Sequence, residues 1–355
     1  RSTQGYSSAA SDVYKRQNAD NRYNMLGDYT APQEDENIKT VLDGVISKLS
    51  PSKVEYVRGC AIRDTTVNEI AEVVEAASRS EVIIAVVGGS SARDFKTSYQ
   101  ETGAAIADEK SISDMECGEG FDRATLTLLG KQQDLLNALK ATGKPLIVVY
   151  IEGRPLDKVW ASEYADALLT ASYPGQEGGY AIADVLFGDY NPAGRLPVSV
   201  PRSVGQIPVY YNKKAPCNHD YVEQAASPLY TFGYGLSYTT FEYSDLQVIR
   251  KSPCYFEVSF KVKNTGSYDG EEVAQLYLRD EYASVVQPLR QLKCFERFFL
   301  KRGEEKEIFF TLTEKDLSII DRNMARVVET GDFRIMIGAS SDDIRLTKDI
   351  FVESQ

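Results

Sequence analysis

The distribution of apolar residues changes once along this chain, near residue 240, and that change limits the folds it can adopt. Ahead of it, continuous apolar runs at 82–87 and 146–151 are typical of strands buried on both faces of a parallel sheet. Segments at 38–49 and 178–187 have apolar residues at helical spacing, which predicts amphipathic helices. Alternation of such strands and helices indicates an α/β fold, with a mostly parallel sheet and helices on both faces.

Beyond residue 240, apolar residues recur at every second position. Phe256, Val258, Phe260 and Val262 alternate with polar residues, and the segment 264–266 (NTG) is a turn signal. Several short strands separated by turns predict an all-β antiparallel sandwich of the immunoglobulin or fibronectin type III kind. The expected fold class is therefore an α/β domain followed by such a sandwich.

The long connection after the 82–87 run contains the most distinctive functional candidate. Glu119 stands between Gly118 and Gly120, and glycine on both sides lets the backbone bend tightly and bring the carboxylate close to a ligand. Asp122 and Arg123 follow at once, so an ion pair between them could brace the turn. A loop that presents one carboxyl group suits a general acid/base. A solvated acidic loop is the alternative interpretation.

Glu116 is the rival carboxylate in this loop, three residues before Glu119, but it lacks flanking glycines. The acidic residues around it do not have the spacing of an EF-hand, so solvated charge is favoured over a calcium site. The five cysteines contain no Cys-x-x-Cys pair and there is a single histidine, His219, which argues against a zinc centre. We expect neither a metal nor a cofactor.

Four short segments occur together in a characteristic order. They are GEGFDR at 118–123, PGQEGG at 174–179, NPAGRLP at 191–197 and FGYGLSYTTF at 232–241. From about Asn18 to its C-terminus the chain resembles the C-terminal half of glycoside hydrolase family 3, which includes many β-glucosidases and β-xylosidases. The resemblance implies that Glu119 is the catalytic acid/base.

The family's N-terminal (β/α)8 barrel, which supplies the nucleophilic Asp, has no counterpart in this chain. The resemblance therefore implies a C-terminal fragment that is inactive alone, with the barrel of the same protein as its missing partner. We expect a leader at 1–17 that is unlike the family and either disordered or artefactual, an α/β domain at 18–212, a linker at 213–240 and a fibronectin-like domain at 241–355.

The resemblance further implies retaining hydrolysis of terminal, non-reducing β-D-glycosyl residues, with glucose as the first choice of sugar and xylose as the second. The substrate would be a β-linked oligosaccharide or glycoside. Two other classes are alternatives: a non-catalytic carbohydrate-binding or interaction module, and a Rossmann-like cofactor enzyme. The segment 88–91 (GGSS) lacks both nucleotide fingerprints, which argues against the cofactor enzyme.

The formal net charge of −12 argues against nucleic acid or an anionic membrane surface as a partner. No apolar run approaches the roughly 18 residues of a membrane span. Residues 1–17 contain no apolar core of a signal peptide, and the family resemblance alone suggests a periplasmic or secreted protein.

Overall fold

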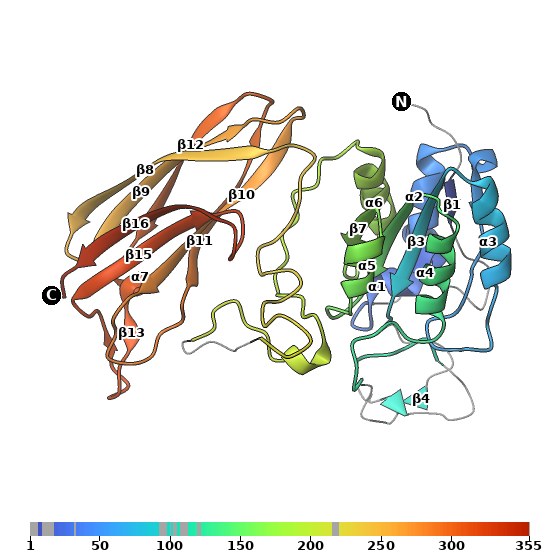
Figure 1. The fold of residues 1–355 in the computed structure, drawn as a ribbon, viewed down its shortest axis with the longest axis horizontal. Coiled ribbons are helices and arrows are strands. Elements are labelled where there is room, and N and C mark those ends of the chain that lie inside the picture. Colours follow the sequence, from blue (N-terminus) through green and yellow to red (C-terminus); the bar gives the residue numbers. More distant parts are fainter. Residues whose placement is uncertain are drawn as a thin grey trace. The chain divides into compact units, whose positions relative to one another are not determined.

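The computed structural model divides the chain into two compact units, Arg1–Tyr190 and Asn191–Gln355. Figure 1 follows the chain through both units. The described residues are 6–8, 18–31, 33–91, 98–99, 101, 105–106, 113–118, 122–214 and 220–354.

The first unit alternates strands with helices, as the sequence predicts. Its elements are β1 (Tyr6–Ser8), η1 (Asn18–Asp20), α1 (Arg22–Leu26), η2 (Asp35–Asn37), α2 (Val41–Lys48), η3 (Pro51–Lys53), β2 (Val54–Tyr56), α3 (Ile70–Arg79), β3 (Val82–Gly88), β4 (Ser98–Tyr99), β5 (Ala105–Ile106), α4 (Gln132–Ala141), β6 (Leu146–Ile151), α5 (Val159–Tyr164), β7 (Ala167–Thr170) and α6 (Gly178–Phe187).

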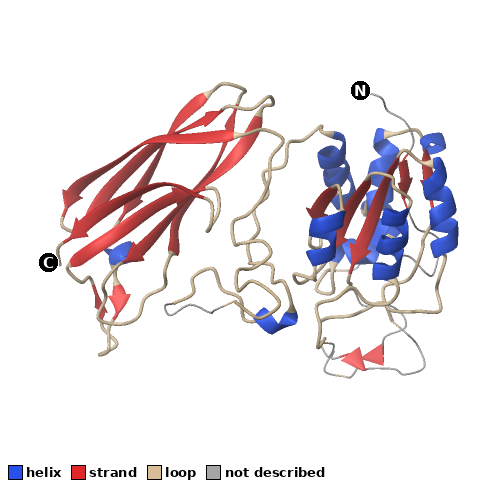
Figure 2. Cartoon of the chain, in the orientation of Figure 1, coloured by secondary structure: helices blue, strands red, loops and turns tan. Residues whose placement is uncertain are grey.

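A parallel sheet in the order β2-β1-β3-β6-β7 forms the centre of this unit. Alternate residues of β3 supply two separate cores. Ile83, Ala85 and Val87 pack with α3, α4 and α5, whereas Ile84 and Val86 pack with α1, α2 and α6. Figure 2 shows the helices on both sides of the strands. The predicted α/β class is confirmed, and the continuous apolar strand is explained by burial of both faces.

Two glycines allow α2 and α6 to approach closely. A Cβ on Gly44 would lie 2.0 Å from the carbonyl oxygen of Gly179, and a Cβ on Gly179 would lie 1.9 Å from that of Thr40. Gly179 belongs to the PGQEGG segment, whose glycines the sequence explains only as a strand-to-helix turn. Gly175, with φ of +83°, serves that turn, while Gly179 serves helix packing.

The N-termini of the helices differ from those that the sequence predicts. The pattern Thr66-x-x-Glu69 predicts a capping box, but α3 begins at Ile70 and Glu69 forms an ion pair with Arg58 instead. A capping box is present at α2, where the hydroxyl of Thr40 accepts from the Asp43 amide at 3.2 Å and the carboxylate of Asp43 accepts from the Thr40 amide at 3.0 Å. Here Asp43 takes the role that Glu or Gln usually has at the third helical position of a capping box.

The second unit is an antiparallel sandwich preceded by an irregular segment. Its elements are η4 (Val204–Gln206), β8 (Phe241–Ser252), β9 (Tyr255–Asn264), β10 (Gly270–Asp280), β11 (Gln291–Leu300), β12 (Glu305–Leu312), α7 (Glu314–Leu317), β13 (Ile319–Ile320), β14 (Arg326–Val327), β15 (Gly331–Gly338) and β16 (Ile344–Val352). Sheets β12-β9-β8 and β11-β10-β15-β16 enclose one apolar core. The alternating residues Phe256, Val258, Phe260 and Val262 are all buried in it, which confirms the predicted sandwich.

The observed boundaries differ from those expected in two places. Tyr6–Ser8, in the expected leader, forms β1 between β2 and β3. The units divide after Tyr190 rather than near residue 212. The segment that begins at Asn191 belongs with the sandwich because Arg195 bonds Glu272 of β10 at 2.6 Å, with both side chains buried.

Candidate active site

The candidate site is the loop that leaves the carboxyl end of β3, where ligands of open parallel sheets usually bind. Glu119, the predicted acid/base, and Gly120 lie outside the described residues. The residues on either side of it, 113–118 and 122 onward, are described and show how the loop is held.

Glu116, the rival carboxylate, is buried against the end of β3. Its side chain is 1% exposed, and its backbone amide donates to the carbonyl of Ser90 at 2.8 Å. The carboxylate occupies the space next to Gly89, where a Cβ would lie 2.1 Å from Oε1 of Glu116. The side chain therefore points into the fold, and Gly89 is the residue that leaves room for it.

Arg123 is the partner of Glu116. Its Nη1 lies 2.5 Å from Oε2 of Glu116 with 6% of the arginine side chain exposed, and its Nη2 donates to the carbonyl of Thr127. The sequence suggested an ion pair between Arg123 and Asp122. In the structure the guanidinium of Arg123 instead meets the buried carboxylate of Glu116.

Asp122 bonds a different arginine, Arg154, which follows β6. Arg154 Nη1 donates to Asp122 Oδ1 at 2.8 Å. This hydrogen bond, together with that from the Arg123 amide, lowers the pKa of the Asp122 carboxyl below its usual value. Asp122 is 82% exposed, so the pair is solvated and contributes little to stability. It nevertheless connects the loop to a second strand end.

Gly118 allows a tight contact on the N-terminal side of Glu119. Its φ of +122° is a conformation that side chains rarely adopt. A Cβ there would also lie 2.7 Å from Cε of Met115 and 2.9 Å from Oδ2 of Asp28. A side chain at this position would therefore be strained by the backbone conformation and crowded by its neighbours.

Tyr173 contacts the described N-terminal part of this loop through its hydroxyl group. Its hydroxyl is 3.6 Å from Sγ of Cys117, and a Cβ on Gly153 would lie 2.6 Å from the same hydroxyl. Burial raises the pKa of both the Tyr173 phenol and the Cys117 thiol, so both groups are neutral at physiological pH.

A second buried ion pair, which the sequence analysis did not single out, lies after β6. Lys158 Nζ is 2.6 Å from Oε1 and 2.7 Å from Oε2 of Glu152. Desolvation raises the pKa of Glu152 and lowers that of Lys158, and each partner's charge opposes the shift. No short sequence motif predicts this pair. The sequence shows only an acidic and a basic residue close together after a predicted strand.

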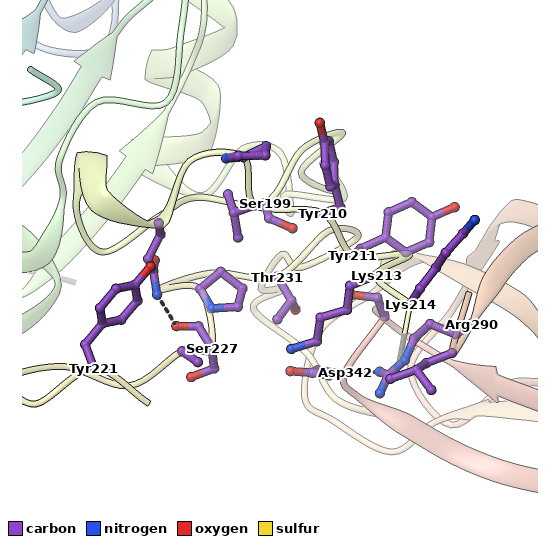
Figure 3. A pocket seen from close by; sticks show the side chains of 17 residues that line it. Ser199, Tyr210, Tyr211, Lys213, Lys214, Tyr221, Ser227, Thr231, Arg290 and Asp342 are labelled. Atoms are coloured by element: carbon purple, nitrogen blue, oxygen red, sulfur yellow. Dashed lines mark hydrogen bonds and ion pairs between the residues drawn. The ribbon is translucent and has the colours of Figure 1, made fainter. Parts of the chain in front are cut away.

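A cavity of about 430 Å³ lies in the second unit, between the segment around η4 and the sandwich (Figure 3). Tyr210, Tyr211, Lys213 and Arg290 are among the residues that line it. Of the predicted site residues that the structure describes, Gly118, Asp122 and Arg123 are not among them. Within the described part of the chain, no group of three or more His, Cys, Asp or Glu side chains is arranged to hold a metal ion.

The fold and loop together define a parallel α/β protein with an acidic loop at a strand's carboxyl end, followed by an antiparallel sandwich. Residues 10–238 match the model of the glycosyl hydrolase family 3 C-terminal domain, and residues 272–341 match that of a fibronectin type III-like domain. The chain belongs to glycosyl hydrolase family 3.

Among curated proteins, the chain is similar to a β-xylosidase of Formosa agariphila (39% identity over 91% of this chain and 43% of the relative). It is also similar to the periplasmic β-glucosidase of Salmonella typhimurium (38% identity, 92% of this chain and 44% of the relative). The chain thus spans less than half the length of these relatives.

Among solved structures, a β-glucosidase from Listeria innocua in complex with laminaribiose matches 99% of this chain and 46% of its own, with a TM-score of 0.82 and 29% identity. In the parts of the chain that the structure describes, no helix has the length and apolar content that a membrane crossing requires.

Proposed function

We propose that this chain is the acid/base-bearing part of a retaining β-glycosidase that removes terminal, non-reducing β-D-glycosyl residues. Family membership and relatives named as β-glucosidases support it. Glucose is the proposed sugar, and the Formosa agariphila relative favours xylose as the second candidate. The complete enzyme would include a barrel that carries the nucleophile, since these relatives are more than twice as long as the matched region.

In this proposal Glu119 acts twice. It protonates the departing glycosidic oxygen while the nucleophile attacks the anomeric carbon, and it then removes a proton from the water that releases the sugar. A retaining mechanism places the two carboxyl groups about 5–5.5 Å apart. The nucleophile must therefore approach the loop closely, and the loop must present Glu119 on its outer side.

The observation that carries the assignment is the position of Glu116. Of the two rival carboxylates, Glu116 is buried and paired with Arg123, so it is turned away from any substrate. The flanking Gly118 adopts a conformation that suits a sharp bend directly before Glu119. These contacts favour Glu119 over Glu116 as the group that reaches the glycosidic oxygen.

The test is to replace Glu119 with Ala in the complete enzyme and to compare glycosides with poor and good leaving groups. Hydrolysis of poor leaving groups should fall by about 10²- to 10⁴-fold, the usual contribution of positioned acid/base catalysis. Activated aryl glycosides should lose less in the glycosylation step, and azide should partly restore their turnover by attacking the covalent intermediate.

Asp114→Asn is the matched control, because it removes another carboxylate from the same loop. It should show neither the leaving-group dependence nor the azide rescue. If Glu119→Ala behaves like the wild type for every leaving group, the acid/base assignment is wrong, and a non-catalytic role for the loop gains support.

A further inference from the structure

The Glu116–Arg123 ion pair joins the two ends of the segment that contains Glu119. Glu116 lies three residues before Glu119 and Arg123 lies four residues after it. Resting on the function proposed above, we propose that this pair is a clamp that positions the acid/base carboxylate, and that Glu116 and Arg123 are positioning residues. The pair holds together the two described ends of this segment.

The clamp is fixed to the sheet as well as closed on itself. Glu116 lies in the space left by Gly89, its amide bonds the carbonyl of Ser90, and Arg63 Nη1 donates to the carbonyl of Met115 at 2.6 Å. Arg123 is held in turn by the Thr127 carbonyl. Both ends of the loop are thus tied to the carboxyl end of β3 and its surroundings.

The bonding of the pair indicates positioning rather than stabilisation. Oε1 of Glu116 and Nε of Arg123 are buried without a hydrogen-bond partner, so the pair is not the two-bond fork that arginine and a carboxylate can form. By contrast, Lys158 meets both oxygens of Glu152, and the Leu156 amide adds a further bond at 3.1 Å. Buried ions that lack some of their hydrogen bonds stabilise a fold poorly, and departures of this kind are expected at functional sites.

The experiment uses Glu116→Gln and Arg123→Lys in the complete enzyme, beside Glu119→Ala. Releasing one end of the loop displaces the acid/base, and a misplacement of about 1 Å can cost about 10²-fold in rate. We expect kcat/KM, which reports the glycosylation step, to fall about 10- to 100-fold for poor leaving groups in Glu116→Gln. For activated aryl glycosides kcat/KM should fall less than about threefold, because protonation of their leaving groups matters little. Arg123→Lys should retain an intermediate rate because it keeps the charge.

Glu152→Gln is the matched control, since it perturbs a buried ion pair of the same unit that does not close this loop. It should lower the melting temperature without creating leaving-group dependence. The clamp proposal is overturned if Glu116→Gln slows poor and good leaving groups equally, or if neither variant slows either class. Where Glu116→Gln fails to fold, Arg123→Lys decides by the same comparison. A Glu119→Ala enzyme without leaving-group dependence overturns the proposed function itself, which separates the two failures.

Discussion

Lys158 and Glu152 face each other inside the first unit, with the ammonium 2.6 and 2.7 Å from the two carboxylate oxygens. Their side chains are only 1% and 4% exposed. The ammonium also lies 4.6 Å from the centre of the Tyr150 ring. The pair is one of the few places in the described chain where two full charges are removed from water together.

Replacing Lys158 with Met should therefore destabilise the first unit strongly. It leaves Glu152 buried without its counter-charge, and breaking a buried pair in this way costs about 3–5 kcal/mol. Denaturant unfolding can be followed by the fluorescence of Trp160, the single tryptophan of the chain. Lys140→Met is the control, since its 3.7 Å pair with Asp166 is on the surface and should contribute less than about 1 kcal/mol. Equal losses from the two variants would contradict the prediction.

Gly89→Ala should destabilise the protein by about 1–3 kcal/mol, the usual cost of forcing an extra methyl group into a packed site. The added Cβ would overlap the Glu116 carboxylate, 2.1 Å away. Gly194→Ala, with no heavy atom within 4 Å of its Cβ, should change stability by less than about 0.5 kcal/mol. Calorimetric unfolding measures both. In a Glu116→Ala background, Gly89→Ala should lower the free energy of unfolding by less. An equal loss in that background would show that the added methyl group overlaps a residue other than Glu116.

Tyr243→Phe should leave stability at pH 7 unchanged or slightly raised. The Tyr243 hydroxyl is buried without a hydrogen-bond partner, so its removal sacrifices no bond. The ring can keep its stacking on Phe260, at 6.0 Å between centroids. If the free energy of unfolding falls by more than about 1 kcal/mol at pH 7, the prediction is wrong, because the hydroxyl must then form a hydrogen bond.

The same variant should differ from the wild type at alkaline pH. Burial raises the pKa of Tyr243 well above its usual value of 10.0. Below pH 10 both native and unfolded chains keep the proton, so the group contributes no pH dependence. Above pH 10 the unfolded chain releases its proton while the native chain keeps it, so stability falls as pH rises, by about 1.4 kcal/mol per unit. Unfolding free energies at several pH values should show a shallower alkaline slope for Tyr243→Phe than for the wild type.

This 355-residue chain by itself should hydrolyse aryl β-glucosides negligibly. The proposed retaining route needs two carboxylates, and the nucleophile is proposed to lie on a barrel outside this sequence. Release of nitrophenol from an aryl β-glucoside provides the measurement. Turnover of a few per second, ordinary for an enzyme, would mean that the nucleophile is present in this chain and has been misplaced.

The amino-acid sequence by itself determined the two fold classes and their order. Residues 82–87 are apolar throughout because both faces of β3 are buried, and 256–262 alternate because β9 buries only one face. Such patterns reflect local backbone geometry combined with burial, so they are readable from neighbouring residues alone. The four segments at 118–123, 174–179, 191–197 and 232–241 likewise indicated the family, since each family motif is contiguous in sequence.

Only the tertiary structure decided which side chains meet. The sequence paired Arg123 with the adjacent Asp122, whereas the fold pairs it with Glu116 and gives Asp122 to Arg154, which is 32 residues away. The need for glycine at Gly89 is equally invisible in sequence, because the atom that would collide belongs to Glu116. Contacts of this kind depend on where the strand ends and loops lie in space, and local periodicity contains no information about those distances.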